Sequence, residues 1–167
     1  SLYDNSTSHQ EQKVAANALT AGKWYHIVGT YDGTGGTSAN AGMQLYVNGE
    51  SVGTNTDAGT YAAMHNKSNA VLIGSFGTDS SFAEGCVTEC SIWDKELSAT
   101  EVTELYNSGL ALDATTHSGS SNLIGYWRNN GFATWQDLTA NNRDGTPTSI
   151  TETMLITAGV DSSRDSQ

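Results

Sequence analysis

Basic residues are scarce in this sequence. Only 7 lysines and arginines stand against 18 aspartates and glutamates, which gives a formal net charge of -11. Such a surface repels phosphate groups, so we expect neither nucleic acid nor an anionic membrane as a partner. The acidic residues are scattered rather than gathered in blocks, and we therefore prefer solubility to a dedicated cation store as the reason for them.

Long apolar runs are also missing. No stretch of about 18 consecutive apolar residues occurs, so we expect no membrane-spanning helix and no membrane insertion. Residues Ser1 to Gln12 lack the basic start and the apolar middle of a signal peptide. If the protein is exported, we expect its signal to lie outside this chain, or its release to follow cell lysis.

Cysteine is limited to Cys86 and Cys90. On one strand, residues four apart have Cα atoms separated by ~13 Å. A disulfide needs less than about 7 Å, so we expect these two thiols not to bond to each other. Further soft ligands are not near them in sequence, and two buried apolar thiols are favoured over a metal site.

Glycine, by contrast, is abundant, and short β-prone segments alternate with polar turns. This composition is typical of an all-β domain rather than a helical bundle. Asn48-Gly49 is a strong hairpin signal, because a type I′ turn needs two residues with positive φ. The expected strands are Lys23–Tyr31, Met43–Val47, Glu50–Thr54, Val71–Gly74, Gly85–Trp93, Leu123–Arg128 and Thr148–Ile156, with a weaker one near Lys13–Ala16.

One short helix is expected late in the chain. Ser98 and Glu101 have the spacing of a capping box, in which each side chain accepts from the other's backbone N–H. Val102 and Leu105 then fall on one helical face. The pattern predicts a helix over Ala99–Ser108.

Four motifs in order resemble one known family. Gly22–Gly33 (GKWYHIVGTYDG), Leu45–Gly49 (LYVNG), Val71–Gly74 (VLIG) and Phe82–Tyr106 are similar to successive motifs of laminin-G-like, concanavalin A-like jelly rolls. The resemblance covers residues 22–109. It implies an all-β fold, an antiparallel two-sheet jelly-roll sandwich with one short helix. We expect one domain over residues 1–157, followed by a tail over 158–167 that is flexible or bound to a partner.

The sequence departs from the family pattern in two places. Few residues precede the Trp24 segment, where the family has several strands. We expect that upstream residues or a partner chain supply the missing strands, or that the front sheet is reduced. Strand edges left open in this way should be covered by upstream residues or by a neighbouring chain. The second departure is Thr88, which stands where the family has an aspartate, although Glu89 remains.

Catalysis is not expected. Glucanases of the related fold carry two glutamates on one strand, and Glu84 and Glu89 have that spacing. Retaining hydrolysis needs the two carboxyl groups ~5 Å apart with a polar group between them, but Cys86 takes the central place. We therefore assign no catalytic residue, and a degenerate glycoside hydrolase stays as the weakest alternative.

Some residues remain candidates for binding. Trp135 is the tryptophan most expected to be exposed to a ligand, whereas Trp24 and Trp93 lie in strand patterns that favour core packing. His26 is expected to be a packed, hydrogen-bonded core residue. A calcium ion is implied by the resemblance, and its candidate ligands share one loop whose residues also suit a simple turn: Asp137, Asn141 and Asp144.

The function that these observations favour is a non-catalytic structural or recognition module at an extracellular or virion surface. Our first expectation is a domain of a virion, phage fibre or decoration protein that mediates assembly or attachment. Its partners would be other protein chains, as copies of itself or as neighbours in a particle. The alternative is a carbohydrate-binding, lectin-like module of an extracellular protein, with glycans as ligands.

Overall fold

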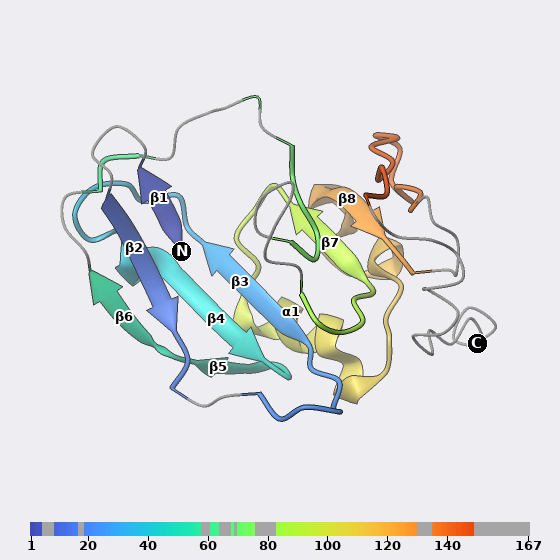
Figure 1. The fold of residues 1–167 in the computed structure, drawn as a ribbon, viewed down its shortest axis with the longest axis horizontal. Helices are drawn as coiled ribbons and strands as arrows, with labels where there is room; N and C mark the ends of the chain where they lie inside the picture. Colours follow the sequence, from blue (N-terminus) through green and yellow to red (C-terminus); the bar gives the residue numbers. More distant parts are fainter. Residues whose placement is uncertain are drawn as a thin grey trace. The chain divides into compact units, whose positions relative to one another are not determined.

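Figure 1 shows the fold in a computed structural model. The chain divides into two compact units. Unit 1 comprises Ser1–Lys67 and Lys95–Leu112, and unit 2 comprises Ser68–Asp94 and Asp113–Gln167. The structure describes residues 1–4, 9–16, 19–57, 61–63, 68, 70–75, 83–129 and 135–148.

One sheet of unit 1 has the strand order β1-β2-β6, with both pairings antiparallel. Its strands are β1 (Leu2–Asp4), β2 (His9–Val14) and β6 (Thr54–Asp57). The sequence predicted little of this sheet beyond a weak strand near Lys13–Ala16. Polar side chains dominate β2 and β6, so their pattern lacks the apolar alternation by which a strand is recognised.

A second antiparallel sheet of unit 1 has the order β3-β4-β5. It consists of β3 (Ile27–Tyr31), β4 (Met43–Val47) and β5 (Glu50–Val52). The bounds of β4 are those predicted. The hairpin is confirmed as well, because Asn48 and Gly49 have φ values of 53° and 80°.

Gly53 carries the chain from one sheet to the other. It has a φ of 93°, and a Cβ atom at this position would lie 2.8 Å from the carbonyl oxygen of Val14. The predicted return strand Glu50–Thr54 is therefore interrupted at this residue, with β5 before it and β6 after it. Only glycine combines this φ with so close an approach of backbone.

The two sheets of unit 1 share an apolar core, and β2 lies against β4. A short 3-10 helix, η1 (Ala39–Gly42), contributes Ala39 to this core. Side chains from both sheets and from the segments between them contribute. The buried cluster consists of Leu2, Ala39, Met43 and Tyr61, with Tyr31 partly buried against it.

The predicted helix is present as α1 (Ala99–Tyr106). Its capping box forms as expected: the Ser98 hydroxyl accepts from the Glu101 N–H at 3.3 Å, and the Glu101 carboxylate accepts from the Ser98 N–H at 2.9 Å. The helix ends two residues before the predicted end, because Asn107 adopts the left-handed conformation with a φ of 45°. A 3-10 turn, η2 (Asn107–Gly109), follows.

Unit 2 is organised around one antiparallel pair of strands, β7 (Cys90–Trp93) and β8 (Leu123–Trp127). Strand β8 ends one residue earlier than predicted. Two 3-10 helices, η3 (Ala114–Thr116) and η4 (Ser120–Asn122), precede β8.

The strand expected over Lys23–Tyr31 begins only at Ile27. Asn48 explains the late start: its side chain accepts from the His26 N–H at 3.0 Å, and its own N–H donates to the His26 carbonyl at 2.8 Å. The hairpin turn thus lies opposite His26, so no residue of β4 is available to pair with Trp24. The prediction that Trp24 packs in the core is wrong, since 57% of it is exposed.

The buried strand expected over Val71–Gly74 is not formed. Val71 is 72% exposed, and the following two apolar residues are exposed as well. Gly74 has a φ of 81°, and its carbonyl accepts from the Ala83 N–H at 2.8 Å. A left-handed residue does not continue a strand, so the apolar run leads into a turn instead.

The strand expected over Gly85–Trp93 is shortened to Cys90–Trp93, because Glu89 has a φ of 55°. Cys86 and Cys90 are not bonded to each other, as predicted, but both are partly buried rather than buried. The last expected strand, apart from Thr148, and the tail over 158–167 lie outside the described residues. Within the part of the chain that the structure describes, no helix is long and apolar enough to span a bilayer.

Candidate functional site

Glu89, immediately before β7, is the most unusual backbone position of unit 2. Its φ of 55° places a long charged residue in the left-handed region. Non-glycine residues in such regions carry a strain of about 1–3 kcal/mol and persist where the surroundings impose them. The other described non-glycine residues with positive φ are short and polar: Asn48, Asn107, Ser108 and Asn142.

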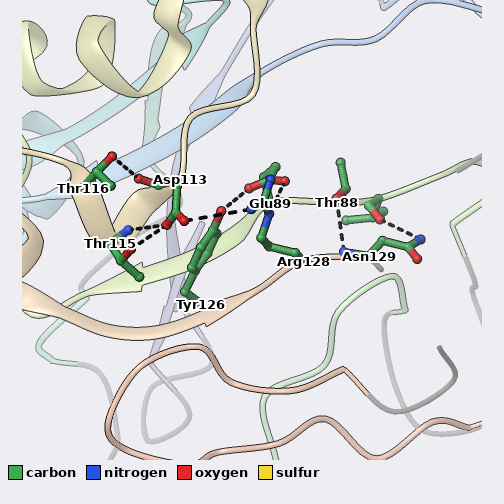
Figure 2. A network of polar contacts seen from close by, with 9 residues as sticks. Thr88, Glu89, Asp113, Thr115, Thr116, Tyr126, Arg128 and Asn129 are labelled. Atoms are coloured by element: carbon green, nitrogen blue, oxygen red, sulfur yellow. Dashed lines mark hydrogen bonds and ion pairs between the residues drawn. The ribbon is translucent and has the colours of Figure 1, made fainter. Parts of the chain in front are cut away.

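Tyr126 in β8 and Arg128 just after it donate hydrogen bonds to the carboxylate of Glu89, in a network of polar contacts (Figure 2). Arg128 donates from Nε at 2.9 Å, and the phenol of Tyr126 donates to the other carboxylate oxygen. The side chains of Glu89 and Arg128 are 22% and 18% exposed, so the pair is reachable from solvent. Charge-assisted hydrogen bonds of this kind are stronger than neutral ones.

Tyr126 is fully buried. Burial raises the pKa of its phenol, and the hydrogen bond to Glu89 and the negative charge of that carboxylate raise it further. A phenol with a raised pKa stays neutral and keeps its proton. Tyr126 therefore keeps the proton that it donates to the Glu89 carboxylate.

Arg128 also faces a second carboxylate. Its Nη1 lies 3.9 Å from Oδ2 of Asp113, whose side chain is 43% exposed. The other oxygen of Asp113 accepts from the N–H and the hydroxyl of Thr115, at 2.9 and 2.6 Å, and so caps the 3-10 helix η3. One guanidinium group thus lies between two carboxylates, and the three groups together carry one net negative charge.

The network continues toward the residues before Glu89. The backbone N–H of Asn129 donates to the Thr88 hydroxyl at 3.2 Å, and its side-chain amide donates to the Val87 carbonyl at 3.5 Å. Figure 2 shows both contacts beside the Glu89 group. The segment before β7 is therefore attached to the continuation of β8 through side chains.

These contacts bear on the hydrolase alternative. Glu84 is exposed, and among the contacts described for this network it takes no part. The carboxylate that Arg128 connects to Glu89 is that of Asp113. Both carboxylate oxygens of Glu89 are engaged within the protein, one by the guanidinium of Arg128 and one by the phenol of Tyr126. The arrangement suits a fixed polar surface better than acid–base chemistry.

The loop expected to bind calcium is organised around Asp137, which is buried. Its carboxylate accepts from four donors: the N–H groups of Tyr126, Thr139 and Arg143 at 3.0, 3.0 and 2.9 Å, and the Thr139 hydroxyl at 3.0 Å. Burial acts to raise the pKa of Asp137, but the hydrogen bonds from Arg143, Thr139 and Tyr126 outweigh it and lower the pKa.

The other two loop residues are also engaged within the protein. Asp144 accepts from the Asp137 N–H at 2.9 Å, and the Asn141 side chain donates to the Ile124 carbonyl at 3.1 Å. A cation at Asp137 would have to displace N–H donors, so these residues do not fit a calcium site as they stand. In the described part of the chain, no three His, Cys, Asp or Glu residues gather to hold a metal ion.

The tryptophans of unit 2 differ in exposure. Trp127 is buried, and its Nε1 donates to the Arg143 carbonyl at 2.9 Å. Trp93 is partly buried, with its ring edge-on to His117 at a centroid separation of 4.9 Å. Trp135, the predicted ligand contact, is also partly buried, and its carbonyl accepts from the Gly145 N–H at 2.7 Å.

His26 in unit 1 is partly buried, with its ring 5.9 Å from that of Tyr106. Burial lowers its pKa. The packing was predicted, but the expected side-chain hydrogen bond is not found, because Nδ1 is buried without a partner among the described residues.

Sequence reasoning singled out Glu89 but missed the residues that bind it. Tyr126 and Arg128 belong to the predicted strand Leu123–Arg128, and their spacing of two places both side chains on one face. Basic residues are rare in this chain, so the position of Arg128 at the end of an apolar strand could have marked it as a functional residue. Its pairing with Glu89 could not be predicted, because the pairing depends on the register between β7 and β8.

Comparison with known proteins adds a family. The model of the concanavalin A-like lectin/glucanases superfamily matches residues 1–103. No curated protein matches the sequence. Among solved structures, the chain is similar to an S-layer domain-containing protein from Clostridium thermocellum ATCC 27405, with 28% identity and a TM-score of 0.39. The match covers 55% of this chain and 43% of that one, so the chain spans less than half of that structure.

Proposed function

The chain belongs to the concanavalin A-like lectin/glucanases superfamily, and from this premise we propose that it is a non-catalytic structural or recognition module. We place it at an extracellular or virion surface, as a domain that mediates assembly or attachment in a phage fibre, decoration protein or similar particle. The proposal includes the architecture of the fold, which is an antiparallel two-sheet jelly-roll sandwich. Small antiparallel sheets with a single α-helix in the described residues are compatible with it.

The observation that carries the non-catalytic proposal is the hydrogen bonding of the Glu89 carboxylate. Both of its oxygens accept hydrogen bonds from the protein, one from Arg128 and one from Tyr126. A glycosidase of this superfamily would need Glu89 and a second carboxyl group free to meet a glycosidic bond ~5 Å apart. Glu84, the partner that sequence spacing offers, is exposed and outside the network.

Hydrolysis assays test this proposal. We expect no release of reducing sugar above the buffer control from β-1,3-, β-1,4- or mixed-linkage glucans, for the wild-type chain and for Glu89→Gln alike. Circular dichroism should show that both proteins are folded. Turnover by the wild-type chain that disappears in the folded Glu89→Gln variant would overturn the proposal and favour the glycosidase alternative.

Carbohydrate binding is the second candidate, and Trp24 supports it. An indole that is 57% exposed offers a flat apolar surface, and flat faces of this kind suit the apolar face of a sugar ring. Trp135, the residue named from the sequence, is partly buried and offers less surface.

Fluorescence titration with soluble glycans distinguishes these tryptophans. A lectin-like module should show a saturable change in tryptophan emission with at least one glycan. Loss of that change in Trp24→Ala but not in Trp135→Ala would assign the contact to Trp24, and the reverse result would assign it to Trp135. A glycan panel that leaves the emission of the folded wild-type chain unchanged would count against the lectin candidate.

A further inference from the structure

We propose that unit 1 contains an acid-sensitive joint, in which protonation of His26 releases the last turn of α1 from the Asn48-Gly49 turn. The His26 joint consists of His26, Asn48, Gly49 and Tyr106, which all belong to unit 1. At neutral pH the joint is closed, with α1 docked on the hairpin. In mild acid it opens, because the imidazole that takes up the proton is partly buried in the contact.

Three parts of unit 1 meet at His26. Its backbone N–H donates to the Asn48 side chain at 3.0 Å, and its carbonyl accepts from the Asn48 N–H at 2.8 Å. Its ring centroid lies 5.9 Å from that of Tyr106, the last residue of α1. Tyr106 also packs on the turn, since a Cβ atom at Gly49 would lie 3.0 Å from Cδ1 of Tyr106. The segment before β3, the turn after β4 and the end of α1 are therefore held together around one imidazole.

The closed joint does not accommodate a second proton on this ring. A charged histidine carries an N–H at both ring nitrogens. Nδ1 of His26 is buried, and it has no hydrogen-bond partner among the described residues. Protonation would thus bury a charge together with a donor that lacks an acceptor, and both are unfavourable. Burial accordingly lowers the pKa of His26.

Helix α1 supplies no carboxylate that would stabilise the charged ring. Its Glu101 binds Lys95 at 2.6 Å. Its Glu104 lies two residues before Tyr106, and therefore about 200° around the helix from it. What α1 presents to His26 is the phenol ring of Tyr106.

The strands supply no carboxylate either. Glu50 is exposed and lies in register with Val47 and Ile27, so its side chain is on the opposite face of the sheet from that of His26. The other titratable groups of residues 22–31 and 43–52 are an amine and phenols: Lys23, Tyr25, Tyr31 and Tyr46. A positive charge on His26 in the closed joint is therefore not compensated by these segments.

The direction of the pH effect follows from the lowered pKa. His26 takes up a proton more readily in the open joint, where its pKa returns to the ordinary 6.5, than in the closed one. Opening is therefore favoured as the pH falls below that value, and the effect levels off below the lower pKa of the closed joint. Each unit of difference between the two pKa values changes the ratio of open to closed molecules about tenfold.

Amide hydrogen exchange measured by NMR tests the joint. Between pH 7.5 and pH 5, after correction for the intrinsic exchange rate, we expect protection in α1 and at Asn48 to fall several-fold, up to about tenfold per unit of pKa difference. Protection in β2 should fall less. His26→Phe keeps a ring against Tyr106 but cannot take up a proton, so its α1 protection should not change with pH. His9→Gln is the matched control, because Nδ1 of His9 is also buried without a partner among the described residues. It should behave as the wild-type chain does.

Three results would overturn the proposal. The first is wild-type protection in α1 that stays constant over this pH range. The second is an equal fall in wild type and folded His26→Phe, and the third is an equal fall in α1 and β2, which would indicate global unfolding. If His26→Phe does not fold, the wild-type chain decides. The loss of α1 protection should then begin near the ordinary histidine pKa of 6.5, and a loss that begins only below pH 5.5 would count against His26.

Discussion

At the scale of the residue, Gly125 in β8 shows how little space unit 2 leaves around Trp127. A Cβ atom at this position would lie 2.4 Å from Cη2 of the Trp127 indole. Gly125→Ala must therefore push the ring away from the Arg143 carbonyl that it hydrogen-bonds. We expect a loss of about 1–3 kcal/mol in the free energy of unfolding, measured by urea titration.

Gly29 in β3 is the matched control for this change. It also lies in a strand, but nothing is within 4 Å of the position that its Cβ would take. Gly29→Ala should leave the free energy of unfolding unchanged or raise it by up to ~1 kcal/mol. Equal effects of the two substitutions would contradict the packing of Trp127 over Gly125.

Asp137 leads to a second prediction at this scale. Asp137→Ala leaves the N–H groups of Tyr126, Thr139 and Arg143 without their acceptor, so we expect a loss of about 2–4 kcal/mol in the free energy of unfolding. Asp144→Ala removes an acceptor for one N–H group only and should lose about 1 kcal/mol. Thermal melting of the two variants, with and without added calcium, measures both effects. Stabilisation of the wild-type chain by calcium that Asp137→Ala abolishes would favour the metal site instead.

Stability should also depend on pH through Asp137. Its pKa in the folded chain is lowered below the ordinary value of 3.8, so the carboxylate favours the folded state at any pH above that value. This contribution is lost as the pH falls from about 3.8 through the lower folded pKa. Urea midpoints measured between pH 6 and pH 2 should therefore fall less steeply for Asp137→Ala than for the wild-type chain.

Single residues were predicted well only where their role is local. Asn48 and Gly49 determine their own turn, and most of the donors to Asp137 come from its own loop, as the turn alternative for that loop requires. Trp24 was predicted wrongly because its burial depends on what lies opposite it. The turn at Asn48 leaves nothing of β4 there, which the sequence pattern of the Trp24 segment alone does not reveal.

At the scale of the element, α1 is held at its start by side chains. The Ser98 hydroxyl accepts from the Glu101 N–H, and Lys95 donates to the Glu101 carboxylate at 2.6 Å. Ser98→Ala should lower the free energy of unfolding by about 1 kcal/mol, as followed by circular dichroism during urea titration. Thr100→Ala, an exposed change inside the helix toward a better helix former, should be neutral or slightly stabilising. A Ser98→Ala protein as stable as Thr100→Ala would contradict the cap.

The elements that were predicted correctly are those with a strong local pattern. Strand β4 has apolar alternation and a hairpin signal at its end, and α1 has a capping box. Strand β1 was missed because it has only three residues, and β2 was largely missed because its side chains are mostly polar and its partner β6 is distant in sequence. Val71–Gly74 failed for the opposite reason: a run of apolar residues indicates burial, but Gly74 turns the chain there.

At the scale of the whole molecule, acidity and open strand edges act against each other. Strand β3 pairs with β4 on one side and, among the described strands, with nothing on the other. Such an edge favours pairing with another chain, whereas a net charge of -11 repels a second copy. Association should therefore increase with salt, which screens the repulsion.

Sedimentation velocity at low and high sodium chloride measures this association. We expect larger species at high salt and a shift toward monomer at low salt. Thr30→Pro would remove a backbone N–H of β3. Thr30→Ala changes the same buried position but keeps that N–H, and it is therefore the matched comparison for effects on folding. A monodisperse monomer at both salt concentrations, with cooperative unfolding, would contradict the prediction and favour a self-contained domain.

The Asn48-Gly49 turn is a site of slow chemical change in the polypeptide. Asparagine followed by glycine is prone to deamidation, in which the Gly49 nitrogen attacks the Asn48 side-chain carbonyl and ammonia leaves. In the folded hairpin that carbonyl oxygen accepts from the His26 N–H at 3.0 Å, a contact that restricts rotation of the side chain. The reaction should thus be slow in the native protein and fast once the hairpin opens. The isoaspartate content at position 48 of a stored sample, read by peptide mass spectrometry, would then record how long its molecules have spent unfolded.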